Sequence, residues 1–132
     1  MVDKDVQKAV ELYQKAAKRG HANAQCNLGY YYKNGIVVEK DVQEAVKWYQ
    51  KAAEQGNAKA QFNLALCYQY GTGVEKDEQK AVEWYKKAAE QGHARAQHNL
   101  ALCYRNGTGV EKDEQKAVEL YQSAGKQFVS TS

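Results

Sequence analysis

Hydrophobic residues recur along the chain at the spacing of one face of an α-helix. In the segment that follows Asp77, small and aromatic residues fall at i, i+4, i+7 and i+8, with charged residues on the opposite side: Ala81, Tyr85, Ala88 and Ala89. The preceding segment, "NAKAQFNLALCYQYG", has the same helical period. No stretch alternates as a half-buried strand would, and the chain contains no proline. The pattern therefore predicts an all-α protein.

The pattern returns every 36 residues. The stretch "NGTGVEKDEQKAVELYQ" from Asn106 also occurs as "YGTGVEKDEQKAVEWYK" from Tyr70 and, in altered form, as "NGIVVEKDVQEAVKWYQ" from Asn34. Each copy joins two helices, so residues 1–132 are predicted to form a single repeat domain of about seven helices. Its parts are a half repeat at 1–20 with a second helix only, repeats at 21–56, 57–92 and 93–128, the last with a degenerate end, and a tail at 129–132.

The glycine corners predict where helices end and begin. Gly71 and Gly107 are expected to end first helices, and the glycines at 20, 56 and 92 to end second helices. The predicted N-caps of the second helices are Asp5, Asp41, Asp77 and Asp113. Glycine loops before helices also bind phosphates, but neither G-x-x-x-x-G-K-[ST] nor a strand followed by G-x-G-x-x-G is present. The corners are therefore interpreted as turns between helices.

Composition narrows the class of protein. The 19 Lys and Arg against 16 Asp and Glu are interleaved, so there is no basic patch of the kind that binds nucleic acid. Cys26, Cys67 and Cys103 lack close spacing and are expected to be free thiols, the last two as core residues. Without a signal peptide at Met1 or an apolar span, the chain is predicted to be cytoplasmic and not inserted in a membrane, with a signal before residue 1 or delivery to a host cell left open.

The motif "AQxxLAxxYxxGTGVEKDxxKAVxWYxKAAEQG" resembles the Sel-one-like repeat, a relative of the tetratricopeptide repeat. The resemblance covers nearly the whole chain and implies a right-handed α/α solenoid of antiparallel helix hairpins. It also implies a protein-binding scaffold whose first helices line a concave surface. One branch of the family staples each hairpin with a disulfide, but Ala53 and Gln61, and Ala89 and Gln97, stand where those cysteines would be. The stapled branch is therefore disfavoured.

Candidate chemistry is sparse. Residues 123–126, "SAGK", spell S-x-x-K but lack the S-D-N and K-T-G motifs that accompany it in penicillin-binding enzymes. His21, His93 and His98 have no metal-binding spacing with one another or with a cysteine. Trp48 and Trp84 are interpreted as packing between repeats, a role that also permits the leucines at the equivalent positions 12 and 120. We therefore expect no catalytic site, no metal and no cofactor.

The first helices offer the candidate site. A rotation of 100° per residue from Leu64 places one set of side chains away from the partner helix, including Cys26. The predicted partner-binding residues are Asn23, Tyr30, Lys33, Lys59, Phe62, Asn63, Leu66, Tyr70, Arg95, His98, Asn99, Leu102 and Arg105. The alternative is that Tyr30, Leu66 and Leu102 only pack between neighbouring helices. Packing gives no reason for four cations and no carboxylate on this face.

The sequence thus predicts a non-catalytic scaffold or adaptor that binds an acidic peptide or protein with apolar anchors. Self-association through exposed terminal repeats is a further expectation. Three alternatives remain open: an RNA-binding helical repeat, a weak hydrolase or cell-wall ligand binder, and a designed or consensus-like spacer.

Overall fold

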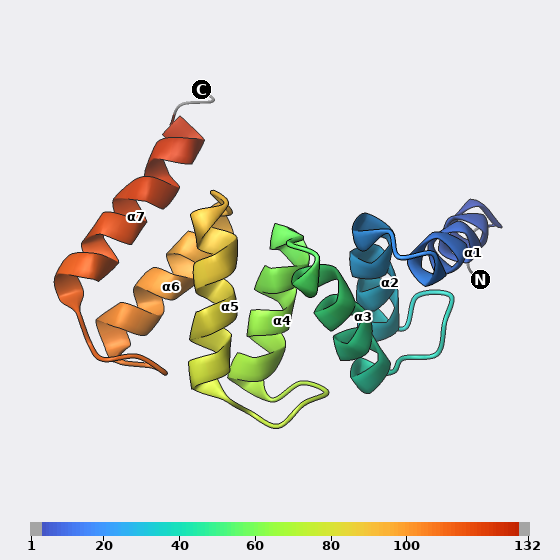
Figure 1. Ribbon diagram of the computed structural model, residues 1–132, viewed down its shortest axis with the longest axis horizontal. Coiled ribbons are helices and arrows are strands. Elements are labelled where there is room, and N and C mark those ends of the chain that lie inside the picture. The colour runs from blue at the N-terminus through green and yellow to red at the C-terminus, as the bar shows by residue number, and fades with distance from the viewer. Residues whose placement is uncertain (1–3, 130–132) are drawn as a thin grey trace.

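The structure is a computed structural model that describes residues 4–129, and the side chains of residues 4–125. Seven helices follow one another in this part of the chain: α1 (Lys4–Lys18), α2 (Ala22–Asn34), α3 (Val42–Glu54), α4 (Ala58–Tyr70), α5 (Glu78–Glu90), α6 (Ala94–Asn106) and α7 (Glu114–Val129). They stand in an elongated, curved row with the chain ends at opposite ends of the row (Figure 1). Each of the long corner loops joins the two helices of one hairpin.

The packing is that of a helical solenoid. The most extensive contacts join α2 with α3, α4 with α5 and α6 with α7, and the next most extensive join α1 with α2, α3 with α4 and α5 with α6. Contacts are therefore made mainly between helices that are consecutive in the chain, as in repeat proteins. Since no strand occurs within residues 4–129, the prediction of an α/α solenoid with seven helices is confirmed.

Three of the four predicted N-caps are confirmed. The carboxylates of Asp41, Asp77 and Asp113 accept hydrogen bonds of 3.0–3.1 Å from backbone N–H groups three residues later, which satisfies one orphan donor of each second helix. The prediction for Asp5 is wrong, because α1 already includes Lys4 and Asp5 lies within its first turn. A carboxylate in a first turn still interacts favourably with the helix dipole.

The glycine corner fixes each hairpin. Gly71 and Gly107 adopt left-handed conformations, with φ of 68° and 71°, and their N–H groups bond to the carbonyls of Cys67 and Cys103. The second glycine of the corner presses against the preceding repeat: a Cβ on Gly109 would collide with the backbone carbonyl of Glu78. The corner is therefore a helix connection in tight backbone contact, as the sequence indicated.

The core is continuous from hairpin to hairpin. Trp84 packs against the buried clusters on both of its sides, and Trp48 packs on Ala17, Ala24 and Leu28, which confirms their role between repeats. Cys26, Cys67 and Cys103 are unpaired and each only 2% exposed. Burial raises the pKa of all three thiols, to about 11 for Cys103. They therefore pack as small hydrophobic side chains.

Candidate interaction surface

We call the face of α2, α4 and α6 that carries the predicted partner-binding residues the inner surface. Seven of these side chains are exposed: Asn23, Tyr30, Lys59, Tyr70, Arg95, His98 and Arg105. Five are half-buried: Lys33, Asn63, Leu66, Asn99 and Leu102. The remaining one, Phe62, is buried. The helical period therefore placed most of the set on an accessible face.

Phe62 was expected on the open surface, and its side chain is only 2% exposed. Its ring stacks on His93 at 4.9 Å between centroids and lies 5.9 Å from the ring of Tyr85. The guanidinium of Arg95 covers it at 4.9 Å. The ring is buried because residues of the following repeat close over it, so Phe62 belongs to the seam between repeats. Cys26, the equivalent residue one repeat earlier, is likewise buried.

The asparagines of the inner surface connect neighbouring elements. The side-chain amide of Asn63 donates to the Cys26 sulfur at 4.0 Å. The amide of Asn99 donates to the hydroxyl oxygen of Tyr85 at 3.4 Å, and that hydroxyl donates to the side-chain oxygen of Gln69 at 2.6 Å. Burial raises the pKa of Tyr85, so its phenol stays protonated and can donate. These asparagines therefore have a structural role within the chain.

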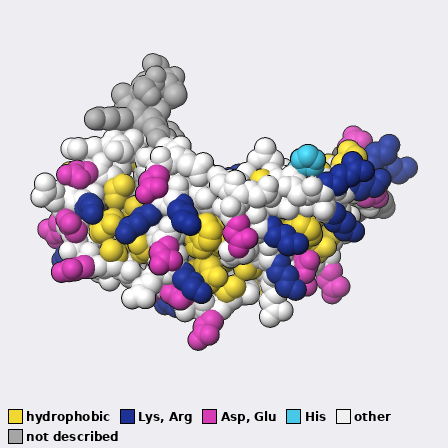
Figure 2. Space-filling model, in the orientation of Figure 1, with side chains coloured by type: hydrophobic (Ala, Val, Ile, Leu, Met, Phe, Trp, Pro, Cys, Tyr) yellow, Lys and Arg dark blue, Asp and Glu magenta, His cyan; other side chains and the backbone are white. Residues whose placement is uncertain are grey.

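Charge separates the inner helices from the rest of the chain. No Asp or Glu occurs in α2, α4 or α6, whereas all three carry cations, namely Lys33, Lys59, Arg95 and Arg105. Among the described residues, the ion pairs join Lys47 with Glu44 and Lys112 with Glu114, so neither uses these four cations. Acidic and basic side chains lie intermixed on the face seen in Figure 2, and none of those carboxylates comes from the inner helices.

The positive field of the inner surface reaches His93, which caps α6 by accepting the Ala96 N–H at its Nδ1, 3.1 Å away. Burial lowers the pKa of His93, and the charges of Arg95 and Lys59 lower it further. The neutral imidazole is required for this bond, because Nδ1 can accept only when it carries no proton. His93 is thus the capping residue of α6.

One hollow on this side gathers three of the predicted residues. It has a volume of about 530 Å³ and brings Arg95, His98 and Asn99 of α6 together with Tyr121, Ala124 and Gly125 of α7. The His98 ring meets the Tyr121 ring edge-on at 5.3 Å between centroids. The sequence interpretation missed the α7 residues because it considered only first helices. The sequence does contain a signal for them, because Tyr121 is equivalent to Tyr85, whose hydroxyl hydrogen-bonds to Gln69 and Asn99 of first helices.

The other sequence candidates for chemistry are the "SAGK" stretch and the possible metal ligands. Ser123 of the "SAGK" stretch lies exposed on α7, and the Lys126 side chain falls outside the described set. Across the described part of the chain, no group of three His, Cys, Asp or Glu side chains is arranged to hold a metal ion. None of its helices combines the length and the apolar composition needed to cross a membrane.

Comparison with known protein families matches one repeat family along nearly the whole chain. The Sel1 repeat profile matches residues 1–21, 22–57, 58–93 and 94–127. No curated protein sequence matches significantly.

Solved structures share the fold over most of the chain. The crystal structure of a Sel1 repeat protein from Oxalobacter formigenes is 41% identical with a TM-score of 0.87, covering 93% of this chain and 50% of that one. The protective antigen c5321 of uropathogenic Escherichia coli, which displays an SLR fold, is 42% identical with a TM-score of 0.86, covering 89% and 25%. Helicobacter pylori cysteine rich protein B is 27% identical with a TM-score of 0.74, covering 96% and 90%. The chain thus spans half of the first relative and a quarter of the second.

Proposed function

Since the chain belongs to the Sel1 repeat family, whose members are in general non-catalytic scaffolds for protein interaction, we propose that its inner surface binds an acidic segment of a partner protein. The segment would lie across α2, α4 and α6 and insert one or two large apolar side chains between the cations.

The observation that carries this proposal is the distribution of charge. The three inner helices hold 4 of the 19 Lys and Arg and none of the 16 Asp and Glu, which leaves 15 cations and 16 carboxylates for the remainder of the chain. A face of one sign on an otherwise balanced protein favours a partner of the opposite sign. The ion pairs between side chains of residues 4–125 do not use these four cations, which leaves their charge open to a ligand.

Apolar contacts come from side chains spaced along the same surface. Tyr30 is 51% exposed and Tyr70 is 69% exposed, although both are large and partly apolar. Leu66 and Leu102 occupy the position equivalent to Tyr30 in the next two repeats, and both are half-buried. Exposed tyrosines beside aliphatic residues are typical of surfaces that bind peptides, because they remove apolar area from water and still offer a hydroxyl.

The expected affinity is modest. Exposed ion pairs contribute little each and are screened by salt, so a dissociation constant of about micromolar order is expected, rising with ionic strength. The unpaired, buried cysteines support a reducing compartment, and a cytoplasmic location is part of the proposal.

A random peptide library selected on the chain tests the proposal. We expect enrichment of peptides with several Asp or Glu and one or two large apolar residues. Charge reversal at Lys59→Glu/Arg95→Glu should weaken their binding by about tenfold or more, whereas the matched reversal Lys8→Glu/Lys15→Glu, at exposed sites on α1, should leave it nearly unchanged. Arg95 also covers the ring of Phe62, so its reversal removes that contact as well. Lys59→Glu alone serves as a variant that leaves the contact intact. Selection of basic peptides, or equal losses from both double variants, would refute the proposal.

A further inference from the structure

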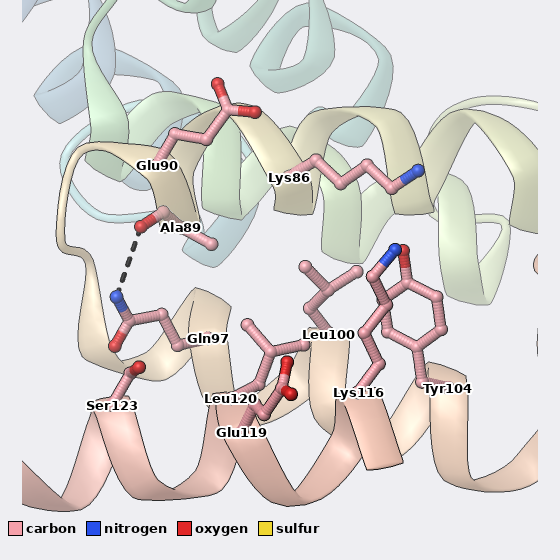
Figure 3. Close-up of a pocket in the computed structure, with 10 residues that line it drawn as sticks. All are labelled: Lys86, Ala89, Glu90, Gln97, Leu100, Tyr104, Lys116, Glu119, Leu120 and Ser123. Atoms are coloured by element: carbon pink, nitrogen blue, oxygen red, sulfur yellow. Dashed lines mark hydrogen bonds between the residues drawn. The ribbon is translucent and has the colours of Figure 1, made fainter. Parts of the chain in front are cut away.

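A second concave site lies on the side of the solenoid formed by second helices. It is a groove of about 490 Å³ between α5 and α7, with α6 as its floor. Ala89, Leu100 and Leu120 supply an apolar base, and Lys86 and Glu119 stand at its edges (Figure 3). Gln97 closes one end by donating to the Ala89 carbonyl at 3.1 Å, drawn as a dashed line in Figure 3. None of these residues belongs to the inner surface.

The repeats show what such a groove holds. At 36-residue spacing, Leu120 is equivalent to Trp84 and to Trp48. The indole of Trp84 packs between the two clusters beside it, and that of Trp48 packs over Ala17 and Leu28. In the preceding repeat, therefore, a tryptophan of the chain itself occupies much of the space that Leu120 leaves open, and the equivalent hollow beside Trp84 and Lys87 is only about 230 Å³.

The residues that form the floor of the groove are of the same types in both repeats, but they are less completely covered in the last one. In the earlier repeat, Trp84 packs against the cluster that contains Ala53 and Leu64, and Ala53, Gln61 and Leu64 are 2%, 4% and 0% exposed. The equivalent residues Ala89, Gln97 and Leu100 are 9%, 8% and 4% exposed. A surface built of identical residue types and shaped to lie under an indole is thus partly uncovered in the last repeat.

A second replacement opens the entrance to the groove. Lys51 and Lys87 extend over the rings of Trp48 and Trp84, with their ammonium groups 4.7 and 4.6 Å from the centroids. The equivalent residue on α7 is Ser123, which lines the groove and is too short to cover it. Both changes, from tryptophan to leucine and from lysine to serine, remove bulk at the same place.

We propose that the groove between α5 and α7 is a docking site for a tryptophan side chain of a partner protein. The indole would lie on Ala89 and Leu100 beside Leu120, as the chain's own indoles lie in the earlier repeats. Recognition would be by shape and apolar contact, as for Trp48, whose buried Nε1 has no hydrogen-bond partner. Lys86 and Glu119 form a polar rim around this apolar contact.

Titration with N-acetyl-L-tryptophanamide, followed by amide chemical shifts, tests this inference. A single side chain should bind with a dissociation constant of about millimolar order and shift amides around Leu100 and Leu120. Leu120→Trp, which fills the groove, should weaken binding by about tenfold or more. The matched control is Leu12→Trp at the equivalent but 65% exposed position on α1, which should leave binding unchanged.

A gain of binding provides an independent check. Trp84→Leu/Lys87→Ser should open a second groove and add shifts around Ala53 and Leu64 at the same ligand concentrations. Shifts that persist in Leu120→Trp, equal binding of N-acetyl-L-leucinamide, or no second set of shifts in the folded double variant would overturn the proposal. Lys59→Glu/Arg95→Glu should have no effect here, which separates this test from that of the inner surface.

Discussion

The second and third repeats, residues 57–92 and 93–128, differ at only 11 of 36 positions, yet they present different surfaces. The 13 residues from the first corner glycine to the glutamate before the tryptophan position are identical in both. Apart from the capping pair Asn57 and His93, the differences fall on the inner surface and between the tryptophan position and the end of the repeat. Residues that set the backbone of the corner are thus the same in both repeats, while residues on the inner surface and around the groove differ.

Two pairs of equivalent residues illustrate this. Phe62 is buried beneath His93 and Arg95, whereas the equivalent His98 is exposed beside Tyr121. Trp84 narrows its groove to about 230 Å³, whereas Leu120 leaves one of about 490 Å³. The same hairpin therefore carries a closed seam in one place and an open site in the other.

The largest expected effect concerns what the two repeats share. Gly109→Val should reduce the free energy of unfolding by about 3 kcal/mol or more, because a Cβ there meets the Glu78 carbonyl and φ is +68°. Gly107→Val needs only the positive φ and has its nearest neighbour, the Lys112 Cβ, at 3.5 Å, so about 1–2 kcal/mol is expected. Urea unfolding measures both. Equal losses would contradict the account of the corner.

The next largest effect is expected from exchanging the residues at the tryptophan position, which makes each repeat resemble the other. Trp84→Leu should lower stability by about 2 kcal/mol, since it removes ring contacts with two core clusters. Leu120→Trp should raise it by up to about 1 kcal/mol by covering Ala89 and Leu100. Thermal unfolding of both variants checks the signs. A Trp84→Leu protein as stable as the parent would show that the indole is not a packing element.

The first repeat extends the comparison with a change of smaller size. Val37 stands where the other corners have Gly73 and Gly109, and its φ of 66° is strained for a β-branched residue. Val37→Gly should therefore stabilise the chain by about 1 kcal/mol, net of the greater entropy of the unfolded glycine chain. Denaturant midpoints of the two proteins would reveal it. A loss of stability would mean that the valine side chain, 37% exposed, contributes more by packing than its backbone costs.

The smallest effect depends on pH. His93 has a pKa below its usual 6.5 in the folded state, so the unfolded chain binds more protons and stability falls as pH drops below about 6.5. With solvent screening the loss from pH 7.5 to 5 should be under about 1 kcal/mol. Asn57 caps α4 at the equivalent position through its side-chain oxygen, 2.9 Å from the Ala60 N–H.

His93→Asn should accordingly keep the cap and remove this part of the pH dependence. Paired unfolding curves at the two pH values measure the difference. An unchanged pH dependence in His93→Asn would show that another group is responsible.

Helices, caps and corners could be predicted because they depend on local residues. Asp77 and Gly71 act within a few positions of themselves, so a single repeat is enough to identify them. The burial of Phe62 could not be predicted from the helical period of its own helix, because it depends on His93 and Arg95 of the next repeat. Likewise, Leu120 is an acceptable core residue by type, and the groove it leaves becomes evident only when its surroundings are compared with those of Trp84.

The central claim is that an acidic partner binds on the inner surface, and mapping where a selected peptide lies tests it most directly. Amide chemical shifts of the isotope-labelled chain would be followed while an acidic peptide from the library is added. The account predicts that the shifts concentrate in α2, α4 and α6, around Lys59, Tyr70, Arg95 and Arg105, and that they fade as salt is raised. Shifts concentrated on α3 and α5, or independent of salt, would contradict it.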